Sequence, residues 1–93
     1  MYNVVKRDGK LVSFDLAKIS TAIRQAFDVC NKQYNPDVID FLALKVTADF
    51  ANKVEDQRVS VEDIQDSVET VLVQAGYADA TSEAIFNNAV SGV

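Results

Sequence analysis

Two β-rich runs separated by Asp8-Gly9, close to the start of the chain, restrict its fold more than any other feature. Residues 2–7 and 10–14 are rich in strand-forming side chains. An Asp-Gly pair between such runs suits a two-residue hairpin turn, because both central positions tolerate positive φ. The sequence therefore predicts a hairpin whose cross-strand pairs are Val5 with Val12, Lys6 with Leu11 and Arg7 with Lys10.

The predicted pairing of Arg7 with Lys10 is unfavourable, because like charges directly opposite each other destabilise a hairpin. An anion lying across Lys6, Arg7 and Lys10 would relieve this repulsion. Charged hairpin tips are also common simply because they remain solvated, and the pattern by itself favours that simpler interpretation.

The composition predicts one small globular domain spanning residues 1–93, with 48% hydrophobic residues. No apolar run is long enough for a membrane span and no signal-peptide pattern is present, so we expect a soluble protein without membrane contact. Cys30 is the single cysteine and histidine is absent. We therefore expect a cytoplasmic protein with no metal site, and a chain that is not an enzyme, because nucleophile–histidine constellations cannot form.

The charges are distributed unevenly along the chain. The net charge is −5, which makes nucleic-acid binding unlikely. Residues 1–24 nevertheless hold five cations and two carboxylates, whereas residues 59–93 hold six carboxylates and no cation. A basic first quarter on an acidic body indicates a small anionic ligand bound at one end of the molecule.

Helical periodicity predicts four amphipathic helices after the hairpin. The first runs over about 16–30 after the cap Asp15, and the second over about 36–54 after the cap Asn35. Residues 57–59 are compatible with a short third strand beside the hairpin. Ser60 caps the third helix and Gly76 ends it; Asp79 caps the fourth, whose apolar stripe contains Ile85, Phe86, Ala89 and Val90.

Lys18 lies in the first turn of the first predicted helix, where a cation opposes the helix dipole unless an anion is also present. It is the second position, after the hairpin tip, at which a phosphate would remove a local penalty. Taken together, the two positions support an anion-binding site as strongly as they support an ordinary solvated surface. Val5 and Val12 are apolar positions of the hairpin on which a flat base could pack.

Two parts of the sequence resemble the ATP-cone family. The first part comprises Val5-Lys6-Arg7-Asp8-Gly9, Phe14-Asp15, Lys18-Ile19, Ala22-Ile23 and Ala26-Phe27. The second comprises residues 61–69 with Leu72 and Gly76-Tyr77. The version closest to this pattern is that of anaerobic, glycyl-radical ribonucleoside-triphosphate reductases (class III). The resemblance implies an α+β fold, in which a small hairpin or three-stranded sheet caps a four-helix bundle. It also implies a regulatory domain that binds ATP or dATP, with magnesium, on behalf of a ribonucleotide reductase.

The resemblance further assigns nucleotide-binding residues. It implies phosphate contacts from Lys6, Arg7 and Lys18, a base or sugar lining from Val5 and Val12 to Ser13, and closure of the site near Val61. The bound nucleotide would change how reductase subunits assemble, and the reductase catalytic domain would be the partner.

The end of the chain departs from the family pattern. The family's last helix continues into a basic end, whereas residues 85–93 carry no charge. This uncharged, half-apolar stretch makes the fourth helix a candidate for self-association. It also leaves an alternative open, in which the chain is a helical protein-interaction module with a degenerate nucleotide site.

Overall fold

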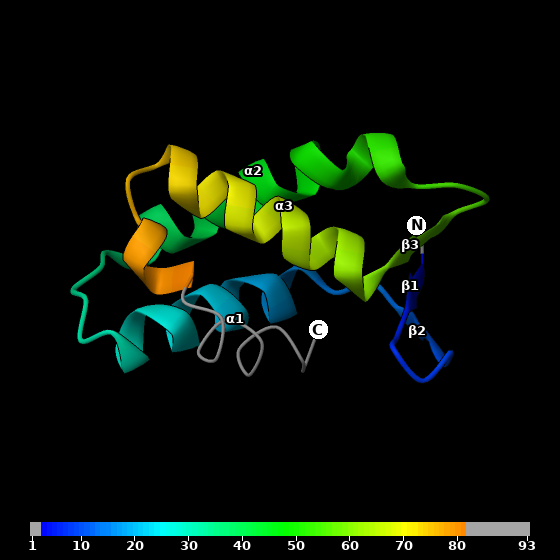
Figure 1. Ribbon diagram of the computed structural model, residues 1–93, viewed down its shortest axis with the longest axis horizontal. Coiled ribbons are helices and arrows are strands. Elements are labelled where there is room, and N and C mark those ends of the chain that lie inside the picture. The colour runs from blue at the N-terminus through cyan, green and yellow to red at the C-terminus, as the bar shows by residue number, and fades with distance from the viewer. Residues whose placement is uncertain (1–2, 82–93) are drawn as a thin grey trace.

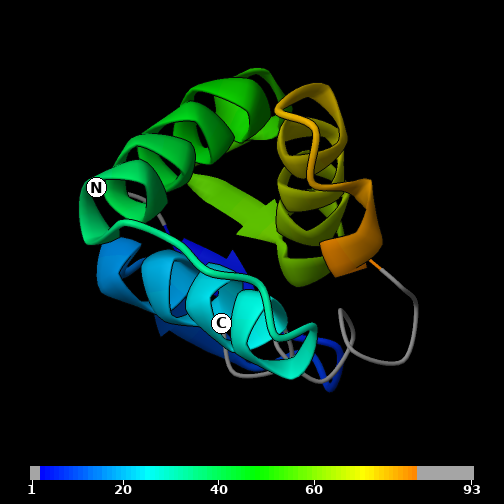
Figure 2. The ribbon, with the colours of Figure 1, turned by 90° about the vertical axis from the view of Figure 1, so that its left-hand side faces the viewer.

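The computed structural model describes residues 3–81, which form three helices and a three-stranded sheet (Figure 1). The sheet lies at one end of the helices, and Figure 2 shows the three helices arranged around a common interior. In chain order the elements are β1 (Asn3–Val5), β2 (Leu11–Ser13), α1 (Leu16–Val29), α2 (Pro36–Phe50), the 3-10 turn η1 (Ala51–Lys53), β3 (Arg58–Ser60), α3 (Val61–Gln74) and the 3-10 turn η2 (Ala78–Thr81).

The sheet has the order β2-β1-β3, with β1 antiparallel to β2 and parallel to β3. Its middle row consists of Val12, Val4 and Val59, and Val4 and Val59 are almost completely buried. Because β3 runs directly into α3, this parallel pairing places the start of α3 beside the hairpin. The predicted third strand is thus confirmed, shifted by one residue.

The predicted hairpin register is wrong by one residue. Val12 pairs with Val4, and Val5 pairs with Leu11. Side chains alternate between the two faces of a strand, so this register is the one that puts both Val4 and Val12 on the face that packs against the helices.

The hairpin loop, residues 6–10, differs accordingly from the predicted two-residue turn. Lys6 and Lys10 close it through a 2.8 Å bond from the Lys6 amide to the Lys10 carbonyl, and the Gly9 amide donates to the Lys6 carbonyl at 2.9 Å. Gly9 has φ +88°, whereas Asp8 is not among the positive-φ residues. Asp8 instead accepts a 3.0 Å bond from the Lys10 amide. Residues 7–9, between the paired Lys6 and Lys10, therefore form a three-residue hairpin connection with Gly9 in the left-handed position.

The predicted caps of the first three helices are confirmed. The side chains of Asp15, Asn35 and Ser60 accept bonds from the amides of Ala17, Asp37 and Asp63, at 3.0, 2.9 and 3.0 Å. Gly76, at φ +91°, ends α3. The Tyr77 amide reaches the Leu72 carbonyl at 2.8 Å, which satisfies one of the last helical carbonyls in a Schellman motif.

The second helix ends earlier than the sequence predicts. The α-helical part of α2 stops at Phe50, and η1 carries the chain to Lys53. Asp56 and Gln57 then have φ +51° and +62°, a left-handed pair that turns the chain back into β3. The periodicity of Phe50 and Val54 continues through η1, which is why the sequence pattern extends the helix too far.

The core is made by one face of each helix together with the middle row of the sheet. An α+β fold is therefore confirmed, with three helices within residues 3–81. The predicted fourth helix falls on residues 82–93, which lie outside the described residues. None of the helices within residues 3–81 has the length and apolarity needed to cross a membrane. The largest side chains with almost no exposed surface are those of Phe27, Phe50, Ile19, Ile23, Ile39, Ile64 and Leu72.

The end of the molecule opposite the sheet is closed by contacts around η2. Asp79 lies inside this 3-10 turn rather than before a helix, and its carboxylate binds Lys32 at 2.9 Å. Cys30 is half-buried against the core, and its Sγ donates to the Asp79 carbonyl at 3.4 Å. The rings of Phe27 and Tyr77 lie 5.0 Å apart. These contacts attach η2 to the end of α1.

Ser67 is completely buried in α3, and its hydroxyl has no hydrogen-bond partner within the described residues. An unsatisfied buried hydroxyl costs about 1–3 kcal/mol, and alanine is the better helix former. We expect Ser67→Ala to raise the free energy of unfolding by about 1 kcal/mol in urea titrations. The matched control Ser60→Ala should lower it by about 1 kcal/mol, because it removes the α3 cap. A destabilised Ser67→Ala would contradict the unsatisfied state of this hydroxyl.

The ion pair between Lys32 and Asp79 makes the stability of the fold sensitive to acid. The side-chain hydrogen bond from Lys32 is the largest cause that lowers the pKa of Asp79. A carboxyl whose pKa is lowered on folding stabilises the protein above its unfolded pKa, and this contribution is lost as the pH falls through the folded pKa. We expect Asp79→Asn to be less stable than the wild type at pH 7 and equally stable near pH 2, by urea titration across pH. Lys32→Met should give the same convergence, and a difference independent of pH would argue against the pair.

Candidate functional site

The hairpin loop carries three basic side chains close to the start of α3. Lys6 and Lys10 face each other across the loop, and Arg7 lies between them in sequence. The predicted Arg7–Lys10 pair is therefore wrong, but the repulsion that it implied remains as a Lys6–Lys10 pair. Within the described residues none of these cations forms an ion pair, so their charges remain available to an anion.

A pocket of about 280 Å³ opens between this loop and α3. It is lined by Lys6, Arg7, Asp8 and Val61, which we call the hairpin pocket. Val61 is 3% exposed and supplies an apolar wall, whereas Arg7 is exposed and Lys6 half-buried. Ligand pockets usually exceed roughly 300 Å³, so this one fits part of a nucleotide, such as its phosphates, better than a whole one.

The start of α3 adds to the electrostatics of the hairpin pocket. Val61 is the first residue of α3, where amide groups without helical partners and the positive end of the dipole favour an anion. Glu62 and Asp63 occupy the same first turn and oppose this effect. The net attraction for a phosphate must therefore come from Lys6 and Arg7.

Arg7 also contacts α3 directly, because its Nη2 donates to the Gln65 side-chain carbonyl. Gln65 is half-buried and lies one helical turn after Val61. Sequence analysis missed Gln65 because an isolated glutamine in a helix carries no charge signal. Its i+4 spacing from Val61 is the signal that could have found it, since such residues share a face.

The other predicted site residues do not line the hairpin pocket. Val5 and Val12 lie on opposite faces of the sheet, because Val12 shares the row of Val4 and Val5 shares that of Leu11. Ser13 is exposed at the end of β2, and Lys18 is exposed in the first turn of α1. Their contacts with a nucleotide stay predictions.

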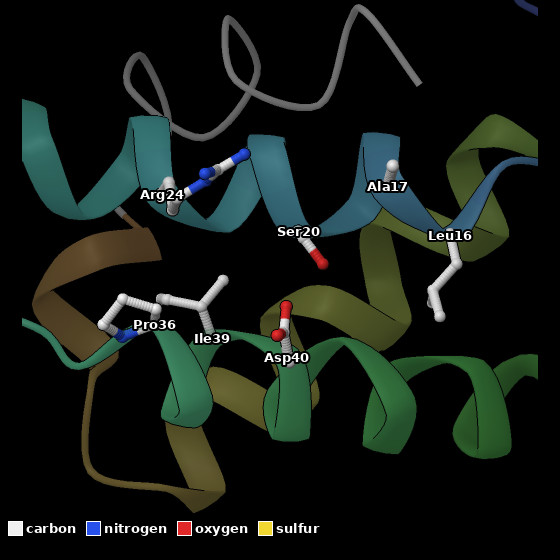
Figure 3. A pocket seen from close by; sticks show the side chains of 7 residues that line it. All are labelled: Leu16, Ala17, Ser20, Arg24, Pro36, Ile39 and Asp40. Carbon is white, nitrogen blue, oxygen red and sulfur yellow. The ribbon is translucent and has the colours of Figure 1, made fainter.

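A second pocket, of about 410 Å³, lies between α1 and α2, and Figure 3 shows its lining side chains. Arg24 and Asp40 bring charges of opposite sign to it, and Ser20 points toward Asp40. An opposed pair has no net attraction for a polyanion, so the smaller hairpin pocket is the better phosphate site. The full lining is Leu16, Ala17, Ser20, Arg24, Pro36, Ile39 and Asp40.

Within residues 3–81 no group of three or more histidine, cysteine or acidic side chains is placed to hold a metal ion. A divalent cation at the hairpin pocket would therefore need ligands from elsewhere. Phosphate oxygens are the usual source for magnesium.

Comparison with known proteins identifies the class to which this arrangement belongs. The profile of the ATP cone domain family matches residues 2–87. The chain is 32% identical over 88 residues to the ribonucleoside-diphosphate reductase subunit alpha of Chlamydia pneumoniae, covering 88% of the chain and 8% of that protein. It is 31% identical over 96 residues to the subunit of the same name from Chlamydia muridarum (strain MoPn / Nigg), covering 94% of the chain and 9% of that protein. The comparison with solved structures gave no match.

The chain belongs to the ATP-cone family, whose members are nucleotide-binding regulatory domains of ribonucleotide reductases. It spans less than a tenth of the length of these two relatives. Both are named as diphosphate reductases, so the narrower resemblance to anaerobic triphosphate reductases is not supported by them.

Proposed function

We propose that this chain binds an adenine nucleotide, ATP or dATP, as an allosteric ligand on behalf of a ribonucleotide reductase. The observation that carries the proposal is the hairpin pocket, where Lys6 and Arg7 lie beside the buried wall of Val61 at the start of α3. Membership of the ATP-cone family supports the same ligand.

In this proposal Lys6 and Arg7 bind the phosphates. Charge-assisted hydrogen bonds to phosphate are about twice as strong as neutral ones, and the guanidinium can bind two oxygens at once. Lys18 is proposed as a third phosphate contact from α1, and magnesium would arrive with the phosphates. Val5, Val12 and Ser13 are proposed to contact the base or sugar, but with Val5 and Val12 on opposite faces only one of the two can do so on a given face.

The regulatory consequence is proposed to be a change in subunit assembly, with ATP permitting activity and dATP suppressing it. The domain would itself carry no catalytic residue, and the reductase catalytic domain would be its partner. Self-association through the apolar stripe Ile85, Phe86, Ala89 and Val90 is the proposed route to assembly. These residues lie outside the described part of the chain.

The alternative is an interaction module whose nucleotide site is degenerate, an idea that rests on the uncharged residues 85–93. Isothermal titration calorimetry with ATP and dATP, each with and without magnesium, separates the two. Saturable binding supports the allosteric module, and its absence at millimolar nucleotide supports the alternative.

Nucleotide affinity should depend on the two basic side chains of the pocket. We expect Arg7→Ala and Lys6→Ala each to weaken ATP binding tenfold or more, because a hydrogen bond to a charged group contributes about 1.5–3 kcal/mol. Lys45→Ala is the matched control, since Lys45 lies on α2 above the Phe41 ring and does not line the hairpin pocket. If calorimetry gives the same ATP affinity for the wild type and all three variants, this site is rejected.

Bound nucleotide should stabilise the hairpin more than the helices, because a ligand stabilises the state that binds it. We expect ATP to raise the melting temperature, and amide hydrogen exchange to slow most at residues 4–18. As a control, Arg7→Ala should show a smaller ATP-dependent shift than the wild type at the same nucleotide concentration. Identical wild-type melts with and without saturating ATP would speak against any nucleotide site.

A further inference from the structure

We propose that Gln65 is a positioning residue for the site: it holds the Arg7 guanidinium at the mouth of the hairpin pocket so that its remaining donors meet a phosphate. This inference rests on the proposed nucleotide function. It adds a role to a residue of α3 that carries no charge and is not among those that line the pocket.

The contact that carries the inference joins two segments separated by 58 positions in the chain. Arg7 can only donate hydrogen bonds, so the atom of Gln65 that meets its Nη2 must be the carbonyl oxygen Oε1. The bond therefore has one possible direction, and the orientation of the Gln65 amide is fixed by it.

The two partners differ in how well the fold holds them. Arg7 is exposed on a three-residue loop and has a long side chain with many rotamers. Gln65 is half-buried in the second turn of α3, one turn after the buried Val61. The helix therefore provides the fixed point, and Arg7 is the group that becomes ordered by the bond.

An arginine held in this way remains competent to bind phosphate. The guanidinium has five N–H donors in a planar fork, and a single bond to Gln65 leaves most of them unused. Ordering the fork before the ligand arrives reduces the conformational entropy lost on binding. Gln65 should thus raise affinity through Arg7, without touching the nucleotide.

A double-mutant cycle tests this role, because residues that act through one another give non-additive effects. ATP affinity is measured by calorimetry for the wild type, Gln65→Leu, Arg7→Ala and the double variant, with urea titrations to show that each is folded. Leucine retains the apolar bulk of glutamine and removes the acceptor. We expect Gln65→Leu to weaken ATP binding about fivefold, and the double variant to match Arg7→Ala within about twofold.

The conservative variant Gln65→Glu provides a rescue, since it keeps an acceptor oxygen for Arg7. Its added charge repels phosphate whether or not Arg7 is present. Adding Arg7→Ala should therefore again cost about tenfold in the Gln65→Glu background, but about twofold in the Gln65→Leu background. A purely structural role of Gln65 would give the same cost in both backgrounds and would overturn the proposal.

Inorganic triphosphate is the second probe, because positioning Arg7 requires neither base nor sugar. The same pattern of losses is expected with it. If the wild type binds ATP and triphosphate but the cycle is additive, or Gln65→Leu binds as well as the wild type, the role of Gln65 is overturned and the nucleotide site stands. If the wild type binds neither probe, the proposed function itself is overturned, and this inference with it.

Discussion

The parallel pairing of β1 with β3 is the constraint on which the rest of the structure depends. It buries Val4 against Val59, and it aligns the third strand so that α3 begins beside the hairpin loop. Without this pairing, Lys6 and Arg7 would lie on an isolated hairpin, which is marginally stable in water. The pocket is therefore a consequence of sheet order rather than of the hairpin alone.

Charge and packing act in opposite directions at this end of the molecule. Burial of the valine row stabilises the sheet, whereas the hairpin residues that follow this row place Lys6 opposite Lys10, where like charges repel. The cost of this arrangement is compatible with a stable fold because the core extends along all three helices to η2, where Lys32 binds Asp79. A small domain can therefore tolerate a loop of unpaired cations at one end, because the core and the contacts at the other end stabilise the fold.

Local signals were sufficient to predict the helix starts, because a cap is a contact between near neighbours. Asp15, Asn35 and Ser60 each bond an amide two or three positions ahead, and apolar spacing then identifies the buried face. The hairpin register was not accessible in the same way. An Asp-Gly pair suits both a two-residue and a three-residue connection, and the burial of Val4 beside Val59 decides between them. The contact between Arg7 and Gln65 depends on that same nonlocal pairing. The i+4 spacing of Gln65 from Val61 indicates a shared helix face, but it does not indicate that Arg7 lies beside this face.

The turn before β3 has a consequence for how the sheet meets other chains. Glu55 and Arg58 exchange two backbone hydrogen bonds, of 2.9 and 2.8 Å, around the left-handed pair Asp56-Gln57. The backbone groups of Arg58 that this turn uses are thereby withheld from any strand added alongside β3. At the other edge β2 offers three residues, and short edge strands are poor templates for intermolecular pairing. Within residues 3–81 both edges of the sheet are thus poor templates for edge-to-edge aggregation.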